Sequence, residues 1–273
     1  MSDGNETIDY GVLRLSFEGP LAVMSLNDPD RLNAVGEEMA VAIAQALSEM
    51  AKPRRKCRAL LIRAEGRAFC AGANLMDNRK AVETGMPSRP VIGRLESVFN
   101  PMLRRLHAVR VPVIVSVNGL ALGIGLGIVL AADYVVASEK AWFQAPFKTL
   151  ASAPDSGLTW LLPRAVGLVR SKRMLMCAEK VDAGTALDWG LVSEMVPAEG
   201  LDRRAMEVAG DFANDATVAL SEIKSLISAG LRSDLHAAME MEVEAVARTS
   251  RTRDNKAAVR VFGKKVKPEF TGE

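Results

Sequence analysis

The stretch VPVIVSVNGLALGIGLGIVLAA, residues 111–132, decides the fold of this chain. It carries no charged side chain over its whole length, which is long enough for a membrane-spanning helix. Pro112, Asn118 and several glycines interrupt it, and no asymmetry of Lys and Arg around it sets a membrane orientation. The stretch therefore predicts a buried strand over residues 113–117, a glycine turn and a buried helix that ends at Ala132.

Outside this stretch, short apolar strands alternate with amphipathic helices. Leu13, Leu15 and Phe17 alternate with polar residues, so residues 10–26 are expected to form a hairpin around a Gly-Pro turn. The order of elements predicts an α/β core with parallel pairing, and the continuous apolar strands indicate that helices cover both sheet faces. The elements expected after the hairpin are a helix at 36–51, a strand at 58–64, a helix at 89–107 and strands at 113–117 and 133–137.

From Gly157 onward the chain is predicted to be helical except at residues 191–196. No low-complexity linker or internal repeat separates this part from the rest. We expect one domain with a helical C-terminal extension, divided into a disordered tail (1–9), a core (10–200), a helical region (201–265) and a second tail (266–273).

The charge balance and the cysteines exclude several classes of protein. With 35 Lys and Arg against 33 Asp and Glu, the 273-residue chain has no basic excess for binding nucleic acid or an anionic membrane. Its 3 cysteines form no CxxC pair, which argues against a disulfide framework or a zinc site and favours a reducing compartment. The polar amino-terminal segment has no apolar signal sequence, so a cytoplasmic location is expected. Since the 2 histidines lie far apart, acid–base chemistry is expected to depend on carboxylates.

Two loops of small residues are candidates for binding a negatively charged oxygen. FCAGANL, residues 69–75, follows one predicted strand, and GIGLG, residues 123–127, follows the next. The second loop lacks the G-x-G-x-x-G spacing of a dinucleotide site, and no acidic residue follows at the distance of a ribose contact. Its glycines let a helix start close to a strand, and unpaired N–H groups at a helix start can donate to an oxyanion. Together the two loops predict a two-donor oxyanion hole.

Asp155 is the one carboxylate between Glu139 and Glu179, and it lies just before a predicted helix. An Asp in this position is a good helix N-cap. Its apolar neighbours, among them Phe147 and Leu158, would raise the carboxyl pKa by desolvation, which suits a general base. From the residues alone, both interpretations, helix cap and acid–base catalyst, stay open.

Five motifs give the chain a resemblance to a known family. From about residue 10 to 265 it resembles the crotonase superfamily, the enoyl-CoA hydratase/isomerase family. The resemblance implies a spiral of ββα units with a helical C-terminal region that packs subunits into trimers, often paired into hexamers. It also implies an acyl-CoA thioester substrate and no metal or redox cofactor, since coenzyme A enters as part of the substrate. The motifs are DPDRLNA (28–34), FCAGANL (69–75), VNGLALGIG (117–125), SGLTWLLPRAVG (156–167) and ALDWGLVSEMVP (186–197).

The resemblance assigns roles to particular residues. In the family, two backbone N–H groups polarise the thioester carbonyl, and the matching positions here are Ala73 and Ile124. Asn74 stands where the first loop usually carries Asp, and Ile124 stands where many members carry Gly. Both changes keep the backbone donors. The positions that match the coenzyme A site are Arg31, Ala71, Ala73, Asn74, Leu75 and Ile124.

Departures from the family pattern indicate the reaction. Hydratases resemble one another in two glutamates that hold a water, and Gly127 and Phe147 stand at those positions. Asp155 matches the position at which the Δ3,Δ2-enoyl-CoA isomerases and the dienoyl-CoA and ring-epoxide isomerase branches carry their catalytic acid. The resemblance therefore implies an isomerase that moves a double bond from C3 to C2 through a thioester enolate, with Asp155 as acid and base. An enoyl-CoA hydratase and a CoA-binding protein without catalysis are the alternatives.

Overall fold

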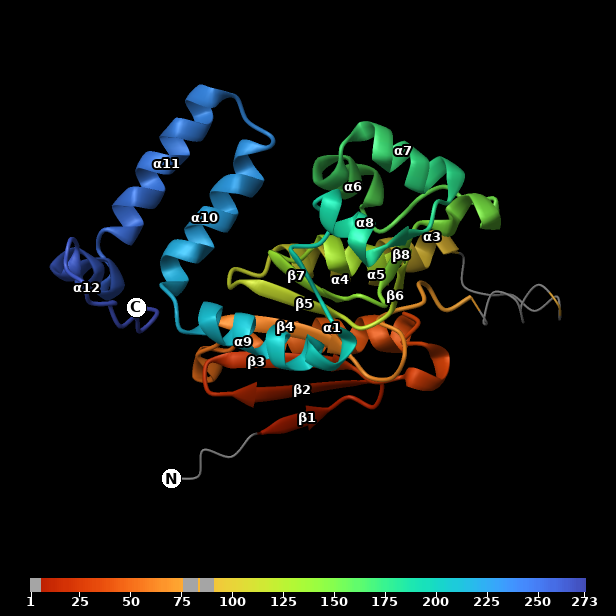
Figure 1. The fold of residues 1–273 in the computed structure, drawn as a ribbon, viewed down its shortest axis with the longest axis horizontal. Coiled ribbons are helices and arrows are strands. Elements are labelled where there is room, and N and C mark those ends of the chain that lie inside the picture. Colours follow the sequence, from red (N-terminus) through yellow and green to blue (C-terminus); the bar gives the residue numbers. More distant parts are fainter. Residues whose placement is uncertain (1–5, 76–82, 84–90) are drawn as a thin grey trace.

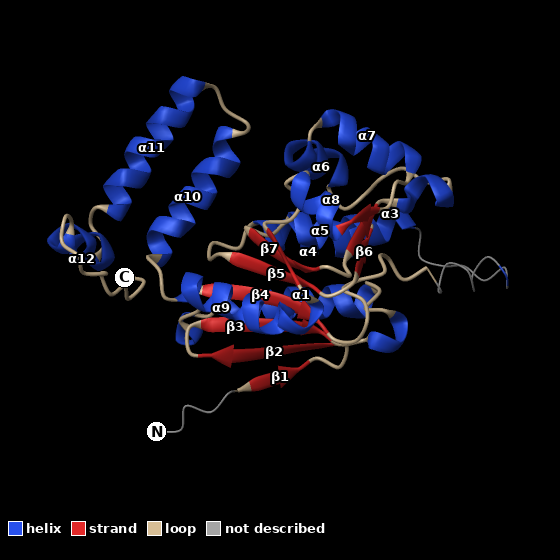
Figure 2. Ribbon diagram, viewed as in Figure 1, coloured by secondary structure: helices blue, strands red, loops and turns tan. Residues whose placement is uncertain are grey.

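A seven-stranded sheet lies at the centre of the computed structural model, which describes residues 6–75, 83 and 91–273 (Figures 1 and 2). The order across the sheet is β1-β2-β3-β4-β5-β7-β10. The first three strands pair antiparallel, and every neighbour from β3 to β10 pairs parallel. The strands are β1 (Thr7–Asp9), β2 (Leu13–Glu18), β3 (Leu21–Leu26), β4 (Ala59–Ala64), β5 (Val113–Val117), β7 (Tyr134–Ser138) and β10 (Glu194–Val196).

The apolar stretch at residues 111–132 forms β5, a short strand β6 (Leu120–Leu122) and α5 (Ile124–Leu130). The predicted strand, turn and helix are confirmed. Within the described part of the chain, no helix is long and apolar enough to cross a membrane. β6 is unexpected, and it pairs with β8 (Trp142–Gln144), which pairs in turn with β9 (Val181–Asp182). Strands of two or three residues are too short to show the alternation that predicts a strand.

Helices cover both faces of the central sheet, as the apolar strands predict (Figure 2). Along β3, Met24 faces the larger core and Val23 faces a second core formed with α9 (Leu201–Ala213). The larger core is closed by α1 (Glu37–Met50), α4 (Asn100–His107) and α5. The other helices of this part are α3 (Val91–Arg94) with a π-helical turn (Leu95–Phe99), α6 (Leu158–Val166), α7 (Leu168–Cys177) and α8 (Ala183–Asp188).

The expectation of a disordered tail at residues 1–9 is wrong for its last residues. Thr7–Asp9 forms β1, which pairs antiparallel with β2, and residues 1–5 lie outside the described part. The sequence hides this strand because only Ile8 contributes a partly buried apolar side chain.

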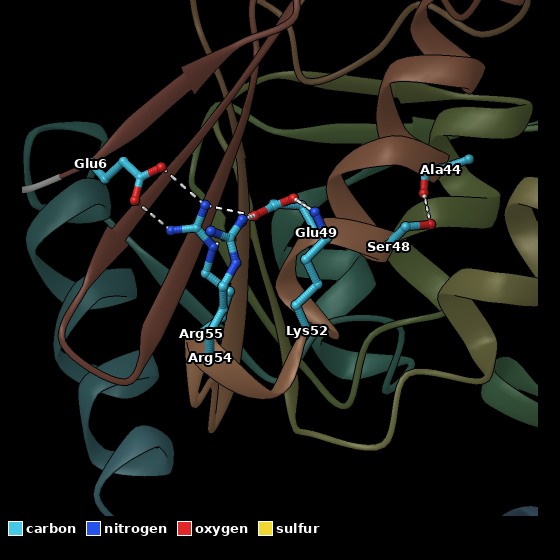
Figure 3. A network of polar contacts seen from close by, with 7 residues as sticks. All are labelled: Glu6, Ala44, Ser48, Glu49, Lys52, Arg54 and Arg55. Carbon is cyan, nitrogen blue, oxygen red and sulfur yellow. Dashed lines mark hydrogen bonds and ion pairs between the residues drawn. The ribbon is translucent and has the colours of Figure 1, made fainter.

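Arg55 fixes the start of β1 to the body of the protein (Figure 3). Its guanidinium donates to Glu6 at 2.5 Å and to Glu49 at 2.6 Å, and it lies 4.3 Å from the centre of the Phe17 ring. Glu49, near the end of α1, also accepts from Arg54 and Lys52. The Glu49 carboxylate therefore binds three cationic side chains close to the edge strand β1.

Three helices at the C-terminal end form an arm that extends away from the sheet (Figure 1). They are α10 (Thr217–Gly230), α11 (Leu235–Thr249) and α12 (Arg253–Val261). Lys224 on α10 forms an ion pair of 2.6 Å with Asp133, whose carboxylate also accepts from the N–H of Val113 at 2.8 Å. The arm is therefore tied to the start of β5.

The expected second tail, residues 266–273, is bonded to the arm and to the core. The buried carboxylate of Asp254 accepts from the N–H groups of Thr271 at 2.7 Å and Gly272 at 2.8 Å. Arg58, just before β4, donates to the carbonyl of Phe270 at 3.2 Å and to the hydroxyl of Thr217 at 2.9 Å. These contacts correct the expectation of a free segment, because charge-assisted bonds to a buried carboxylate outweigh the polar composition of the segment.

Candidate active site

A parallel β-bridge joins the two loops of small residues. Cys70 pairs with Ala121: the N–H of Cys70 donates to the carbonyl of Leu120 at 3.0 Å, and the N–H of Leu122 donates to the carbonyl of Cys70 at 2.9 Å. Both loops leave this pair in the same direction. A Cβ added at Gly72 would lie 3.4 Å from the carbonyl oxygen of Leu122, so the loops then run in contact.

Each loop carries a backbone N–H that has no hydrogen-bond partner among the described residues, at Ala73 and at Ile124. Their chain neighbours are paired: the N–H of Asn74 donates to Val35 at 3.0 Å, and the N–H of Gly123 donates to a carbonyl at 3.2 Å. Ile124 is the first residue of α5, where the helix geometry leaves an N–H without a partner. Unpaired N–H groups therefore stand at the two positions that the resemblance assigns to the oxyanion donors, and their role stays a prediction.

The glycines of the second loop are required by close packing. A Cβ added at Gly125 would lie 2.7 Å from the Cβ of Cys70 and 2.9 Å from its carbonyl oxygen. At Gly127 it would lie 3.0 Å from the carbonyl oxygen of Ser156. Gly123 has a φ of +49°, in the region that favours glycine. The interpretation that these glycines let a helix start against a strand is confirmed.

A cavity of about 730 Å³ opens over the two loops, and the three predicted catalytic residues Ala73, Ile124 and Asp155 all line it. Of the residues that match the coenzyme A site, Ala71, Ala73, Asn74, Leu75 and Ile124 line this cavity. Arg31 does not. It lies in a 3-10 turn next to the first loop, its side chain is 64% exposed, and its guanidinium lies 3.6 Å from the Asp28 carboxylate.

Asp155 is half-buried in the cavity wall. Burial raises the pKa of its carboxyl above the ordinary value of 3.8, because the charged form loses contact with water. The hydroxyl of Ser156 donates to Oδ1 at 2.7 Å and opposes this shift in pKa. A carboxyl with a raised pKa is closer to the working range of a general base at neutral pH.

The interpretation of Asp155 as a helix cap is wrong. α6 begins after Gly157, and no side chain caps its first N–H groups. Ser156 and Gly157 both have positive φ angles, +57° and +73°, so a left-handed turn separates the carboxylate from the helix. The Asp155 carbonyl accepts from the N–H of Leu158 at 3.1 Å, while the carboxylate bonds to Ser156 instead.

The two positions that the resemblance matches to the hydratase glutamates, Gly127 and Phe147, hold no carboxylate. Gly127 packs on Ser156 as described above. Phe147 lines the cavity and is 8% exposed, and its ring tip lies 4.0 Å from the place that a Cβ would take at Gly123. An aromatic ring therefore occupies the floor of the cavity beside the second donor loop.

Sequence reasoning missed three charged residues of the cavity wall, Glu37, Glu83 and Arg94. The two glutamates are exposed, whereas the side chain of Arg94 is buried. Glu37 belongs to the outward-facing polar residues of a predicted helix, so its pattern gave no sign that it faces a ligand. Among the described carboxylates of the wall, Asp155 is therefore the one that is partly withdrawn from solvent.

Comparisons with known proteins identify the family of the chain. The model of the enoyl-CoA hydratase/isomerase family matches residues 16–273. The chain is 34% identical over 256 residues to the 1,2-epoxyphenylacetyl-CoA isomerase of Escherichia coli K12, covering 94% of this chain and 97% of that protein. It is 31% identical over 256 residues to the short-chain-enoyl-CoA hydratase of Clostridium acetobutylicum, covering 93% and 95%.

The crystal structure of an enoyl-CoA hydratase/isomerase from Cupriavidus metallidurans CH34 superimposes with a TM-score of 0.88 at 28% identity, covering 97% of this chain and 98% of that one. The match covers nearly the whole length of both chains. The α/β fold is therefore the crotonase fold. By sequence and by structure, this chain belongs to the enoyl-CoA hydratase/isomerase family.

Proposed function

We propose that this chain is an enoyl-CoA isomerase that moves a double bond of an enoyl-CoA thioester from C3 to C2. The observation that carries the proposal is the half-buried carboxylate of Asp155, which lines the same cavity as the unpaired N–H groups of Ala73 and Ile124. A single base and an oxyanion hole are sufficient for this reaction.

In the proposed reaction the thioester carbonyl accepts from the N–H groups of Ala73 and Ile124. Asp155 in its charged form takes a proton from C2, and the electron pair moves onto the thioester oxygen to give an enolate. The two donors stabilise that negative charge, which is larger than in the substrate. The protonated Asp155 then returns its proton to C4, the double bond settles between C2 and C3, and the enzyme regains its starting state.

The coenzyme A portion is proposed to lie along the first loop. Ala71, Asn74 and Leu75 line the mouth of the cavity there, and the small side chain of Ala71 lets a ligand approach the backbone. Arg31 lies at the surface next to this loop, and its exposed guanidinium, which pairs with Asp28 at 3.6 Å, is proposed to meet a phosphate of coenzyme A.

An enoyl-CoA hydratase is the second candidate, because Glu37 and Glu83 also line the cavity and several relatives are named hydratases. Addition of water needs groups that hold the water as well as a proton donor. Gly127 packs closely against Ser156, and the ring of Phe147 is buried, so neither position offers a carboxylate to hold a water as the hydratase glutamates do.

The test supplies the purified protein with a 3-enoyl-CoA and a 2-enoyl-CoA separately and separates the products by mass spectrometry. We expect the first to become the 2-enoyl-CoA and the second to yield almost no 3-hydroxyacyl-CoA. Asp155→Ala should lose the reaction, and Asp188→Ala, at the exposed end of α8, should keep it.

Isomerisation that persists in Asp155→Ala would overturn the assignment. Rapid hydration by the wild type would favour the hydratase instead, and Glu37→Gln and Glu83→Gln would then identify its second carboxylate. If neither substrate reacts although acyl-CoA binds, the chain is a CoA-binding protein without catalysis.

The family resemblance also leads us to propose a homotrimer or a hexamer of two trimers. The arm carries two rows of exposed apolar side chains at helical spacing, which a monomer rarely exposes to water. One row lies on α10 and its end (Ile223, Ile227 and Leu231), and the other lies on α11 (Leu235, Met239, Val243 and Val246).

A further inference from the structure

Ser156 makes contacts that the proposed reaction has not yet used. Its side chain is buried, and its hydroxyl donates to Oδ1 of Asp155 at 2.7 Å. Its backbone has a φ of +57°, a conformation that costs a non-glycine residue free energy and therefore persists where the surroundings enforce it. The residue next to the candidate base is thus held in an unfavourable conformation.

The enforcing contact is with α5. A Cβ added at Gly127 would lie 3.0 Å from the carbonyl oxygen of Ser156 and 3.1 Å from its Cβ. Ser156 therefore fits against the bare backbone of Gly127, on the helix whose first residue supplies the second oxyanion donor. The carboxylate and that donor are held by the same packed contact.

The two oxygens of the Asp155 carboxylate have different surroundings. Oδ1 accepts from Ser156, whereas Oδ2 has no hydrogen-bond partner among the described residues. Among the described residues, Oδ1 of Asn118 is the one side-chain nitrogen or oxygen that is fully buried and has no hydrogen-bond partner. Because Oδ2 of Asp155 also has no partner, it is not fully buried. Oδ2 is therefore the oxygen that is open to a ligand.

We propose that Ser156 is a positioning residue for Asp155: its hydroxyl anchors Oδ1, which fixes the plane of the carboxylate and leaves Oδ2 to take the proton from C2 and return it to C4. The inference rests on the proposed function. Rotation about the last torsion of an Asp side chain is loosely restricted, so one anchored oxygen decides where the other lies. A base that serves two carbons in one turnover needs this fixed geometry.

The anchor also acts on the charge of Asp155. A hydroxyl that donates to the carboxylate stabilises its charged form, so losing the hydroxyl raises the pKa of Asp155 further. The other charged or titratable groups that line the same cavity are Glu37, Glu83 and Arg94, and those that line the neighbouring cavity behind Ser156 are Arg104, His107, Asp133, Arg164, Lys224 and Arg232. These groups are the same in every variant below, so a change between variants reports on the hydroxyl.

The test compares Ser156→Ala with Ser156→Gly in the full-length protein. Both lose the hydroxyl, but Gly also relieves the left-handed backbone. Two quantities are measured: the pH dependence of isomerisation, and the titration of the Asp155 carboxyl carbon by nuclear magnetic resonance. Ser171→Ala is the matched control, because this buried serine also donates a short hydrogen bond, to the carbonyl of Gly167, on α7 outside the cavity.

We expect kcat near neutral pH to fall on the order of tenfold in both Ser156 variants, with KM within about twofold, because one charge-assisted hydrogen bond is lost. In both Ser156 variants, the acid limb of the rate profile and the titration of the Asp155 carboxyl should move to higher pH. In Ser171→Ala, neither should move. A titration that stays in place in both variants overturns the inference, as does a loss seen in Ser156→Ala alone, which would assign the effect to the backbone. If the titration moves but the wild type isomerises nothing, the anchor stands and the proposed function fails.

Discussion

Cys70 and Ala121 face each other in a parallel β-bridge, and the two unpaired N–H groups of the site follow this pair at the same distance along each chain segment, at Ala73 and Ile124. Parallel segments in register carry equivalent backbone groups to the same level. The spacing of the two donors is therefore a property of the strand pairing, and it exists before any thioester binds.

The first prediction concerns the N–H of Ile124. Proline is compatible with the first position of a helix and removes the N–H, so Ile124→Pro deletes one donor while α5 can still form. We expect kcat for isomerisation to fall about 10²–10³-fold, the usual effect of losing one oxyanion donor. Ile124→Val keeps the N–H and serves as the control. If the two variants turn over equally fast, this amide does not carry the charge of the enolate.

Asp155→Asn is expected to make the protein more stable at neutral pH while it removes activity. Burial raises the pKa of Asp155 above 3.8, so the folded protein binds this proton more tightly than the unfolded chain does. The free energy of unfolding of the wild type therefore falls as the pH rises from 3.8 through the raised pKa. Above the raised pKa, the charged carboxylate destabilises the folded protein. Thermal melts should show a higher Tm for Asp155→Asn at pH 7, with a difference that shrinks as the pH falls through the raised pKa toward 3.8. A lower Tm at pH 7 would contradict the desolvation argument. Activity should fall about 10²–10⁴-fold.

Gly127→Glu tests whether this site can be given the glutamate of a hydratase. Because a Cβ there would crowd the carbonyl oxygen of Ser156 at 3.0 Å, we expect a loss of about 1–3 kcal/mol in the free energy of unfolding and no gain of hydration. Gly210→Glu on α9 is the matched control, since a Cβ at Gly210 meets open space. Chemical denaturation compares the two variants, and a Gly127→Glu protein that hydrates 2-enoyl-CoA at wild-type stability would refute the packing argument.

The ion-pair network around Glu49 predicts a loss of stability in acid. Hydrogen bonds from Lys52, Arg55 and Arg54 lower the pKa of Glu49 from 4.5 to about 2. A carboxyl with a depressed pKa in the folded state stabilises the protein above its ordinary pKa, and this contribution disappears as the pH falls through the depressed value. Glu49→Gln should therefore have a lower Tm than the wild type at neutral pH, with the two curves converging near pH 2. Curves that stay parallel at every pH would show that the charge of Glu49 does not matter.

The apolar row on α11 predicts the oligomeric state. Val243 is 66% exposed, and Glu in its place would bury a charge in any contact with a second copy. Sedimentation velocity should find a trimer or hexamer for the wild type and smaller species for Val243→Glu. Glu242→Gln, one residue away on the same helix, changes the net charge by one unit in the opposite direction and should leave the assembly intact. A wild type that sediments as a monomer at all concentrations would contradict the proposed trimer or hexamer.

The parts of the fold that could be predicted are those with long local signals. β5 is a run of branched apolar residues, and α1 repeats its buried side chains at helical spacing, so each is visible within one window of sequence. β6, β8 and β9 could not be predicted, because strands of two or three residues depend on partners that lie far away in the chain.

The candidate site divides in the same way. Asp155 and the donor positions Ala73 and Ile124 were marked by position and by resemblance, and the structure brings all three to one cavity. The role of Ser156 could not be foreseen, because it depends on a left-handed φ and on the contact with Gly127, neither of which leaves a pattern in the sequence. The capping interpretation of Asp155 failed for the same reason, since the turn between the carboxylate and α6 is set by tertiary packing.

The contact between Arg58 and Phe270 has a consequence for the order in which the protein matures. The two residues stand 212 positions apart, so Arg58 and the strand it precedes leave the ribosome long before its partner is made. Domains begin to fold from the amino end during synthesis. The sheet can therefore form first, and the contacts of residues 270–272 with Arg58 and Asp254 are made later, after the arm itself has been synthesised.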